Sequence, residues 1–333
     1  QIAISKQKVS GFIISHPVTM IRTNAMLSDM NHKSSPSSRK ETASGFIEGF
    51  GAYLWWGLVT TFYFRYMRET SPLELLTWRV LAGLPVVVFI LTVRSDFGQF
   101  FKVIRQPKAV ALLLASALLI LGNWLTFIYS VVNARVSEAS LGYYINPLVS
   151  VALGSIFLGE KLRPLQWFAV SIAMSGVLYL TWVEGTLPWI SLVLAISFAL
   201  YGLIRKQVEA SAEVGLAIEM TILFFPMLIL QIYLAQGGNT VFLNSNEMTL
   251  GLIFGGFVTV VPLWLFSRAA RKLRLTTVGL MQYLAPTAQL MVAIFYIGEE
   301  VGTKWIALSL IALAISIYSI DSIRASRSEP LDG

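Results

Sequence analysis

The sequence predicts an all-helical integral membrane protein, and two features of its composition lead to that prediction. Of the 333 residues, 56% are hydrophobic and only 13% are charged, whereas soluble domains carry about 25% charged residues. Ten apolar runs are long enough to cross a bilayer as helices, which takes about 20 residues each. These runs cover 45–64, 72–93, 109–132, 138–158, 164–182, 187–204, 214–235, 250–267, 276–297 and 305–320.

The polar remainder predicts how the chain is organised. Residues 1–44 are expected to form a disordered basic tail, because the stretch 31–44 is rich in Ser and Lys and has little to bury. The chain begins with Gln1, so translation could start at an internal methionine of this tail without changing the membrane helices. Residues 45–182 and 187–321 form two helical halves, 322–333 form a C-terminal stub, and the short loops leave no room for a soluble catalytic domain.

The distribution of charge predicts the orientation. Within the ten runs only five charged residues occur, and they are Glu48, Glu74, Arg79, Glu138 and Glu219. If the N-terminus is cytoplasmic, the inner segments hold 20 Lys and Arg residues and the outer loops hold four. Because cytoplasmic loops are enriched in Lys and Arg, both termini are expected in the cytoplasm. The net charge of +7 is explained by this orientation, so no nucleic-acid partner is expected.

The residue inventory excludes several kinds of chemistry. The chain has no cysteine, which excludes disulfides, thiolate metal sites and cysteine nucleophiles. Its two histidines, His16 and His32, both lie in the tail, and no motif for nucleotide phosphates or zinc occurs. We therefore expect no catalytic residues, no metal and no cofactor, and the chain is not expected to be an enzyme.

An internal repeat relates the two helical halves. A shift of 139 residues aligns five identical pairs without a gap: Arg135 with Arg274, Tyr144 with Tyr283, Pro147 with Pro286, Gly159 with Gly298 and Glu160 with Glu299. Each half contains five spans, and because five is odd, the second half enters the membrane from the opposite side. Ten transmembrane helices in two inverted five-helix repeats are typical of secondary transporters, although duplication also builds channels and scaffolds.

Matched prolines indicate where a substrate could bind. Pro147 and Pro286 lie near the middle of the fourth and ninth spans and are expected to interrupt both helices there. Such paired breaks point to a binding site at the membrane midplane. Polar and aromatic residues flank the two prolines: Tyr143, Tyr144, Asn146, Gln282 and Tyr283. Their side chains are expected either to contact a substrate or to satisfy the backbone carbonyls that the prolines leave without a donor.

Arg79 is the charged residue that most needs a partner. It lies about 10 Å from the outer end of the second span, where a cation costs about 2.5–3.5 kcal/mol. We expect it to face the bundle interior and to meet a carboxylate, backbone carbonyls or an anionic ligand, which would favour an anionic or zwitterionic cargo. Glu138 and Glu219 could each pair with Arg79 or carry a coupling proton, or Arg79 could belong to a structural ion pair.

The third span adds Asn123 and Trp124 in a run of Leu, Ala and Phe. A buried Asn in a membrane usually joins helices, and ligand contact is the alternative. Gly251, Gly255 and Gly256 form a face of small residues on the eighth span, which predicts close helix packing.

Several motifs resemble a known family. SLGYYINP at 140–147 is followed by GE at 159–160 and by Pro164, which is similar to the EamA branch of the drug/metabolite transporter superfamily. LTWRV at 76–80, GNWLTFI at 122–128 and YGLIRK at 201–206 resemble its RarD subgroup, whose members are named chloramphenicol-sensitive proteins. The resemblance implies ten helices, a central cavity, transport without ATP and a bacterial inner membrane. Glu160 and Glu299 match the family's recurring Gly-Glu step, and because they stand where one helix ends and the next begins, helix capping or loop bracing is expected of them rather than catalysis or coupling.

Together these features predict a secondary transporter that moves a small-molecule substrate across the lipid bilayer by alternating access. Two other classes stay open: a membrane-embedded transferase, and a membrane scaffold or sensor that transports nothing. The sequence carries no signal for the cargo, the direction, the coupling ion or the oligomeric state.

Overall fold

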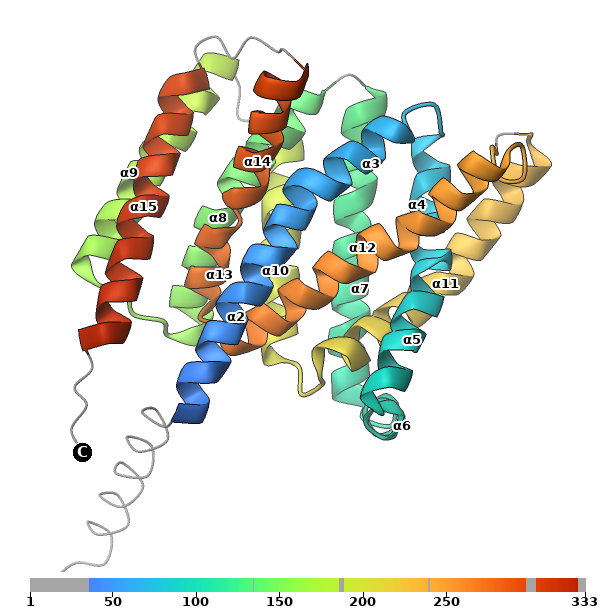
Figure 1. Cartoon of the computed structure of the whole chain (residues 1–333), viewed down its shortest axis with the longest axis horizontal. Helices are drawn as coiled ribbons and strands as arrows, with labels where there is room; N and C mark the ends of the chain where they lie inside the picture. Colours follow the sequence, from blue (N-terminus) through green and yellow to red (C-terminus); the bar gives the residue numbers. More distant parts are fainter. Residues whose placement is uncertain (1–35, 134, 186–188, 239, 298–303, 329–333) are drawn as a thin grey trace, which may run out of the picture. The chain divides into compact units, whose positions relative to one another are not determined.

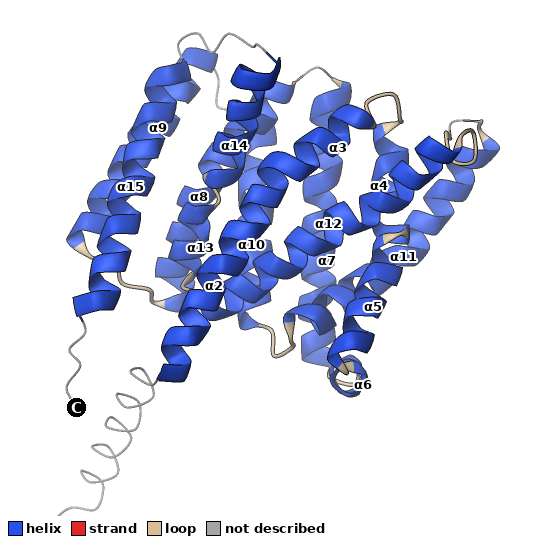
Figure 2. Ribbon diagram, in the orientation of Figure 1, coloured by secondary structure: helices blue, strands red, loops and turns tan. Residues whose placement is uncertain are grey.

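The fold is described here from a computed structural model, shown in Figure 1. The structure describes residues 36–133, 135–185, 189–238, 240–297 and 304–328. The chain divides into two units, Gln1–Ala43 and Ser44–Gly333. All regular structure within the described residues is helical, as Figure 2 shows.

Helices occupy all ten segments that the sequence marked as apolar. The first segment is built from α2 (Pro36–Leu54), the π-helical turn η1 (Trp55–Val59) and α3 (Thr60–Tyr66). The second contains α4 (Pro72–Leu81) and α5 (Gly83–Arg94), and the ninth contains α13 (Leu275–Met281), α14 (Leu284–Val292) and the π-helical turn η2 (Ala293–Ile297). The other segments are single helices: α7 (Pro107–Val132), α8 (Val136–Leu158), α9 (Pro164–Glu184), α10 (Trp189–Gln207), α11 (Ala212–Gln236), α12 (Asn246–Lys272) and α15 (Lys304–Ser328).

Eight of these segments in the described part of the chain are long and apolar enough to cross a membrane. The last segment contains a shorter apolar stretch, Ser309–Tyr318. The first helix begins at Pro36 rather than at residue 45, so residues 36–44, expected to be disordered, are helical. Several other helices also extend past the predicted ends, because charged residues continue the helix where hydrophobicity stops.

One helix was not anticipated. α6 (Phe97–Ile104) follows the second membrane segment, and Val103 is buried while Phe97, Phe101 and Ile104 are exposed. Eight residues are too short to cross a bilayer. Exposed aromatic and aliphatic side chains on a short amphipathic helix are typical of the membrane interface.

The expected proline breaks are only partly present. The ninth segment is interrupted at Gln282 and Tyr283, just before Pro286, because Pro286 has no N–H to donate to the Gln282 carbonyl. α8, in contrast, is one helix with Pro147 inside it, so the interruption expected there is not found. The second segment has a turn at Ala82, three residues before Pro85, which the sequence analysis missed.

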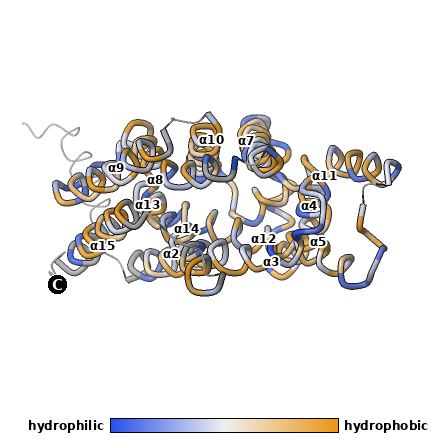
Figure 3. Tube along the Cα trace, turned by 90° about the horizontal axis from the view of Figure 1, so that it is seen from above, coloured by the Kyte–Doolittle hydropathy of each residue, from blue (hydrophilic) through white to orange (hydrophobic). Residues whose placement is uncertain are grey.

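The helices pack closely where side chains are small. In the view from above (Figure 3), α9, α8, α10, α7 and α11 form one row, and α15, α14, α2 and α12 form a second. The predicted close packing of the eighth segment is confirmed. A Cβ atom on Gly256 would lie 2.3 Å from the Ala82 carbonyl carbon, so α12 crosses the second segment directly at its turn.

Ion pairs between helices gather at one end of the second unit, which we call the charged end. There Glu48 of α2 meets Arg268 of α12 at 2.6 Å, and Lys272 adds a second cation at 2.7 Å. Arg94 meets Glu213 at 2.6 Å between α5 and α11. Another pair lies where α9 starts and α15 ends, between Arg163 and Asp321 at 2.7 Å. The pair between Arg163 and Asp321 links the two rows, and the other pairs join neighbouring helices at this end.

Candidate substrate site

Arg79 lies among aromatic side chains contributed by three helices. It occupies the last turn of α4, which Pro72 starts at its first position, where the missing N–H costs nothing. Its Nε donates to the Thr259 hydroxyl of α12 at 3.0 Å. Its guanidinium carbon lies 4.2 Å from the Trp124 ring centroid and 5.8 Å from that of Phe64. These distances are within the range of cation–π attraction.

No carboxylate neutralises Arg79 within the residues that the structure describes. Tyr63 and Tyr143 are the ionisable groups that act on it electrostatically. Glu138 instead pairs with Arg135 at the start of α8, at 2.5 Å. Glu219 pairs with Arg205, at 3.6 Å. The ion pair between Arg79 and either glutamate, which the sequence left open, is therefore absent from the described structure, and both glutamates have other partners.

Arg205 and Glu219 form a fully buried charge network. The Glu219 carboxylate accepts hydrogen bonds from Ser116 of α7 at 2.5 Å and from Tyr201 of α10 at 3.3 Å. Arg205 donates to the Ala212 carbonyl at 2.7 Å and to the Ser267 hydroxyl at 3.2 Å. Arg205 was missed because the predicted sixth span ended at 204, whereas α10 continues to Gln207.

Asn123 joins two helices. Its side-chain amide donates to the Leu194 carbonyl and to the Ser197 hydroxyl of α10, each at 2.9 Å. Both amide hydrogens are therefore occupied, and this favours the helix-joining role over ligand contact. Trp124, one residue later, is only 6% exposed and faces Arg79.

The other sequence-predicted polar residues gather where α8 meets the ninth segment. Asn146 and Gln282 are both within reach of Ser150, whose hydroxyl lies 3.4 Å from the Asn146 Oδ1 and 3.4 Å from the Gln282 Nε2. The rings of Tyr144 and Tyr283 lie 6.5 Å apart. Among the described atoms, Gln282 Oε1 and the Tyr283 hydroxyl are buried without a hydrogen-bond partner. Tyr143 belongs with Arg79 instead.

Three residues around Arg79 were not predicted. Tyr63 and Phe64 lie in the first segment, and Thr259 lies in the eighth. The run TTFYFRY in α3 is unusually aromatic, and this is the one sequence signal that could have indicated the aromatic surroundings of Arg79. Thr259 carries no such signal, because a threonine in an apolar helix commonly bonds its own backbone.

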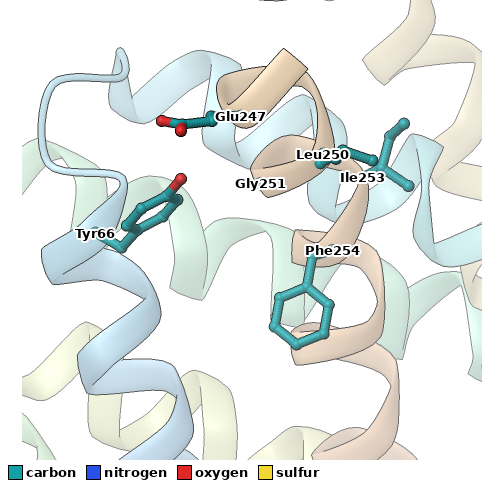
Figure 4. Close-up of a pocket in the computed structure, with 6 residues that line it drawn as sticks. All are labelled: Tyr66, Glu247, Leu250, Gly251, Ile253 and Phe254. Atoms are coloured by element: carbon teal, nitrogen blue, oxygen red, sulfur yellow. The ribbon is translucent and has the colours of Figure 1, made fainter. Parts of the chain in front are cut away.

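Two surface hollows lie elsewhere in the described structure. One, of about 550 Å³, is lined by Tyr66, Leu250 and Phe254, and Figure 4 shows the Tyr66 hydroxyl and the Glu247 carboxylate pointing toward one another beside it. The other, of about 630 Å³, lies between α5 and α12 and includes Phe89 and Trp264. Their largely exposed apolar linings are suited to lipid contact, and neither includes Arg79.

Glu160 is engaged in capping. Its carboxylate accepts hydrogen bonds from the backbone N–H groups of Leu275 at 2.7 Å and Thr276 at 2.9 Å. A carboxylate stabilises unpaired N–H groups at a helix start, and here the helix is α13. The capping role expected for Glu160 therefore agrees with its contacts. Glu299, its counterpart in the repeat, lies outside the described residues.

Comparison with known proteins gives consistent relatives. Residues 43–182 match the EamA-like transporter family. The proteins named RarD of Salmonella typhi and of Escherichia coli strain K12 are each 39% identical to this chain, over 87% and 86% of it and over 99% and 98% of their own lengths. An uncharacterized transporter of Pseudomonas aeruginosa is 40% identical over 87% of the chain and 97% of its own length.

A solved structure shares the fold. A protein of known crystal structure that is 17% identical superposes with a TM-score of 0.65, over 85% of this chain and 99% of its own. At that identity the similarity shows the fold alone.

Proposed function

Since the chain belongs to the EamA-like transporter family and, within it, to the RarD group, we propose that it is a secondary transporter of small metabolites or drugs. The observation that supports this most strongly is the 39% identity to RarD proteins along nearly their whole length. In this proposal the protein resides in the bacterial inner membrane and works by alternating access without ATP.

The proposed mechanism needs ten spans in two inverted repeats, and the packing supports that arrangement. A pseudo-twofold axis would exchange the first segment with the sixth, the second with the seventh, the third with the eighth and the fourth with the ninth. The contacts occur in the pairs that such an axis requires. α10 packs on α8 as η1 packs on α14, and α12 packs on α4 as α7 packs on α11. An inverted repeat with two alternative packings is what a rocking carrier uses.

We propose that the charged end faces the cytoplasm. It contains the ends of helices whose loops are rich in Lys and Arg, including Arg268, Arg271 and Lys272 of α12. Both termini then lie in the cytoplasm, and Arg79 lies in the outer half of the membrane.

We assign the proposed substrate site to Arg79, Trp124 and Tyr143, with Tyr144, Gln282 and Tyr283 nearby on α8 and the ninth segment. The unpaired buried atoms of Gln282 and Tyr283 in the described structure favour a polar contact that is made only in part of the cycle. Asn123 supports the site by joining α7 to α10, whereas Asn146 accepts a hydrogen bond from Ser150 within α8. Glu219 stays a proposed proton carrier, and Glu138 a weaker one because it lies at a helix end.

Metabolite profiling followed by reconstitution tests the proposal. Solutes whose levels differ between a deletion strain and an overexpressing strain are measured in proteoliposomes, with and without a pH gradient. We expect saturable flux and counterflow, and stimulation by the gradient if Glu219 carries a proton. Flux without counterflow would indicate a channel. Turnover of a lipid-linked substrate would indicate a transferase. The absence of flux over a broad panel of solutes would indicate a scaffold or sensor.

Site-directed labelling tests the topology. Because the chain has no cysteine, single cysteines can be introduced without removing any native one. Glu184→Cys, between the fifth and sixth segments, should react with an impermeant maleimide from outside, and Lys161→Cys should react only after permeabilisation. Cytoplasmic labelling at 184 would contradict the inverted repeat.

A further inference from the structure

We infer that Arg79 binds the carboxylate of the transported solute, and that the apolar body of the solute packs on Trp124 and Phe64. This inference rests on the proposed transport function and adds a substrate class to it, a small organic monocarboxylate. It follows from what surrounds Arg79 and from comparison with a second buried arginine in the same chain.

The guanidinium of Arg79 is incompletely satisfied. Among the described residues, only its Nε has a hydrogen-bond acceptor, the Thr259 hydroxyl. An arginine has five N–H donors, so the four on its two terminal nitrogens have no acceptor in the described part of the chain. The residue is half-buried, whereas Arg205 is fully buried. A cation this deep in a membrane normally faces a partner.

Arg205 shows how this chain treats a structural arginine. It is completely buried, its Nε and Nη2 bond to Ser267 and Ala212, and the chain supplies Glu219 as a counter-ion. Arg79 has no such counter-ion among the described residues. The difference indicates that the missing anion at Arg79 comes from outside the chain.

The repeat strengthens this contrast. Arg79 is the eighth residue of α4, counted from Pro72, and Glu219 is the eighth residue of α11, counted from Ala212. A serine precedes each helix, so the two residues occupy matching positions. The second half therefore carries an anion that its own Arg205 neutralises, whereas the first half carries a cation with no ionic partner among the described residues.

A carboxylate fits this site better than other anions. The planar guanidinium can hold a carboxylate by two parallel hydrogen bonds. A phosphate dianion would bring a second negative charge, and no other Lys or Arg acts on Arg79 electrostatically within the described residues. The Trp124 ring at 4.2 Å and the Phe64 ring at 5.8 Å offer apolar surface beside the charge.

Binding assays with matched probes test the inference. The full-length protein is placed in lipid nanodiscs, and the affinities of benzoate and benzamide, and of hexanoate and hexanamide, are measured by equilibrium dialysis. We expect each carboxylate to bind at least tenfold more tightly than its amide. Inorganic phosphate should compete poorly.

Variants separate charge from packing. Arg79→Gln should abolish the preference for the carboxylate, and Arg79→Lys should keep only part of it. Trp124→Leu should weaken carboxylate and amide equally. Arg65→Gln is the matched control, because Arg65 also lies over an aromatic ring, that of Tyr296 at 5.9 Å, but is exposed. It should leave all four affinities unchanged.

Several outcomes would overturn the inference: equal binding of acid and amide, a preference that persists in Arg79→Gln, stronger competition by phosphate, or no saturable carboxylate binding. If Arg79→Gln does not fold, Thr259→Val replaces it in the test. Thr259→Val removes the acceptor of the Arg79 Nε, so the ratio of carboxylate to amide affinity should change severalfold. Transport that is unchanged in the Arg79 variants would contradict this inference but not the proposed function. Arg79-dependent binding without counterflow contradicts the proposed function alone.

Discussion

At the scale of single residues, the intramembrane charges differ in whether the chain supplies their partners. Arg205 and Glu219 form a buried ion pair at 3.6 Å, Glu74 accepts hydrogen bonds from the loop at Thr240 and Val241, and Arg79 lacks an ionic partner in the described structure. A structural pair and a binding residue should therefore respond differently to substitution.

Removing one member of the buried pair should destabilise the fold strongly. Arg205→Met leaves the Glu219 carboxylate buried with only hydroxyl partners, and breaking a buried pair costs about 3–5 kcal/mol. The double variant Arg205→Met with Glu219→Gln should recover most of that loss, because no uncompensated charge remains. Unfolding free energies in mixed micelles measure both. Equal losses for the single and the double variant would show that the pair contributes through packing rather than charge.

Asn123 should act on stability and not on substrate affinity. Asn123→Leu removes both hydrogen bonds to α10, and interhelical hydrogen bonds in membranes contribute about 1–2 kcal/mol in model peptides. We expect a lower unfolding free energy with an unchanged KM for any transported solute. A raised KM at wild-type stability would instead place Asn123 in the substrate path.

Sequence reasoning identified Arg79 but not its environment. A charge in an apolar run is conspicuous, so Arg79 stood out. Thr259 lies 180 residues away and is an ordinary residue in such a run, so only the folded helix packing could place it beside Arg79. The same limit explains Arg205, which lay one residue beyond the predicted apolar run and was counted as solvated.

At the scale of helices, hydrophobicity predicted where the segments are, but not where they bend or end. The predicted spans stopped before the charged ends of α10 and α12. The short amphipathic helix α6 was missed because it contains no long apolar run. Proline was a poor guide to breaks, since α8 continues through Pro147. A proline removes one hydrogen bond, and neighbouring helices decide whether the helix continues.

The crossing of α12 over the second segment makes one glycine critical. At Gly256 an added methyl group would meet backbone atoms of Ala82 and Gly83 at 2.3–2.5 Å, and backbone cannot move aside cheaply. Gly256→Ala should therefore cost at least about 1–3 kcal/mol, as overpacked cores do. Unfolding in mixed micelles measures the loss.

Two other glycines serve as controls. At Gly251 the nearest atom is the flexible Met67 side chain, so Gly251→Ala should cost much less than Gly256→Ala. Gly98 of α6 has nothing within 4 Å, and Gly98→Ala should be neutral or stabilising. Equal losses for all three variants would show that close packing at Gly256 is not the cause, because helix propensity by itself favours alanine over glycine.

At the scale of the whole molecule, the ion pairs at the charged end would act as a gate under the proposed alternating-access mechanism. Glu48 joins the first half to α12 of the second, and Arg94 of the first half meets Glu213 of the second. Ion pairs of this kind between described helices are concentrated at this end, whereas Arg79 lies toward the other. Under that mechanism, a state in which these ion pairs are formed would be closed at the charged end.

Weakening the gate should open the charged end. Glu48→Gln removes the charge that holds Arg268 and Lys272, so the population open at that end should rise severalfold. A reporter cysteine at Ala269, which is fully buried and lies 3.5 Å from the Cβ position of Gly49, reports opening between α2 and α12. Its maleimide reaction should accelerate in Glu48→Gln, while Glu209→Gln, which changes an exposed glutamate at the same end, should leave the rate unchanged. Equal rates in the wild type and Glu48→Gln would mean that these ion pairs stabilise the fold without controlling access.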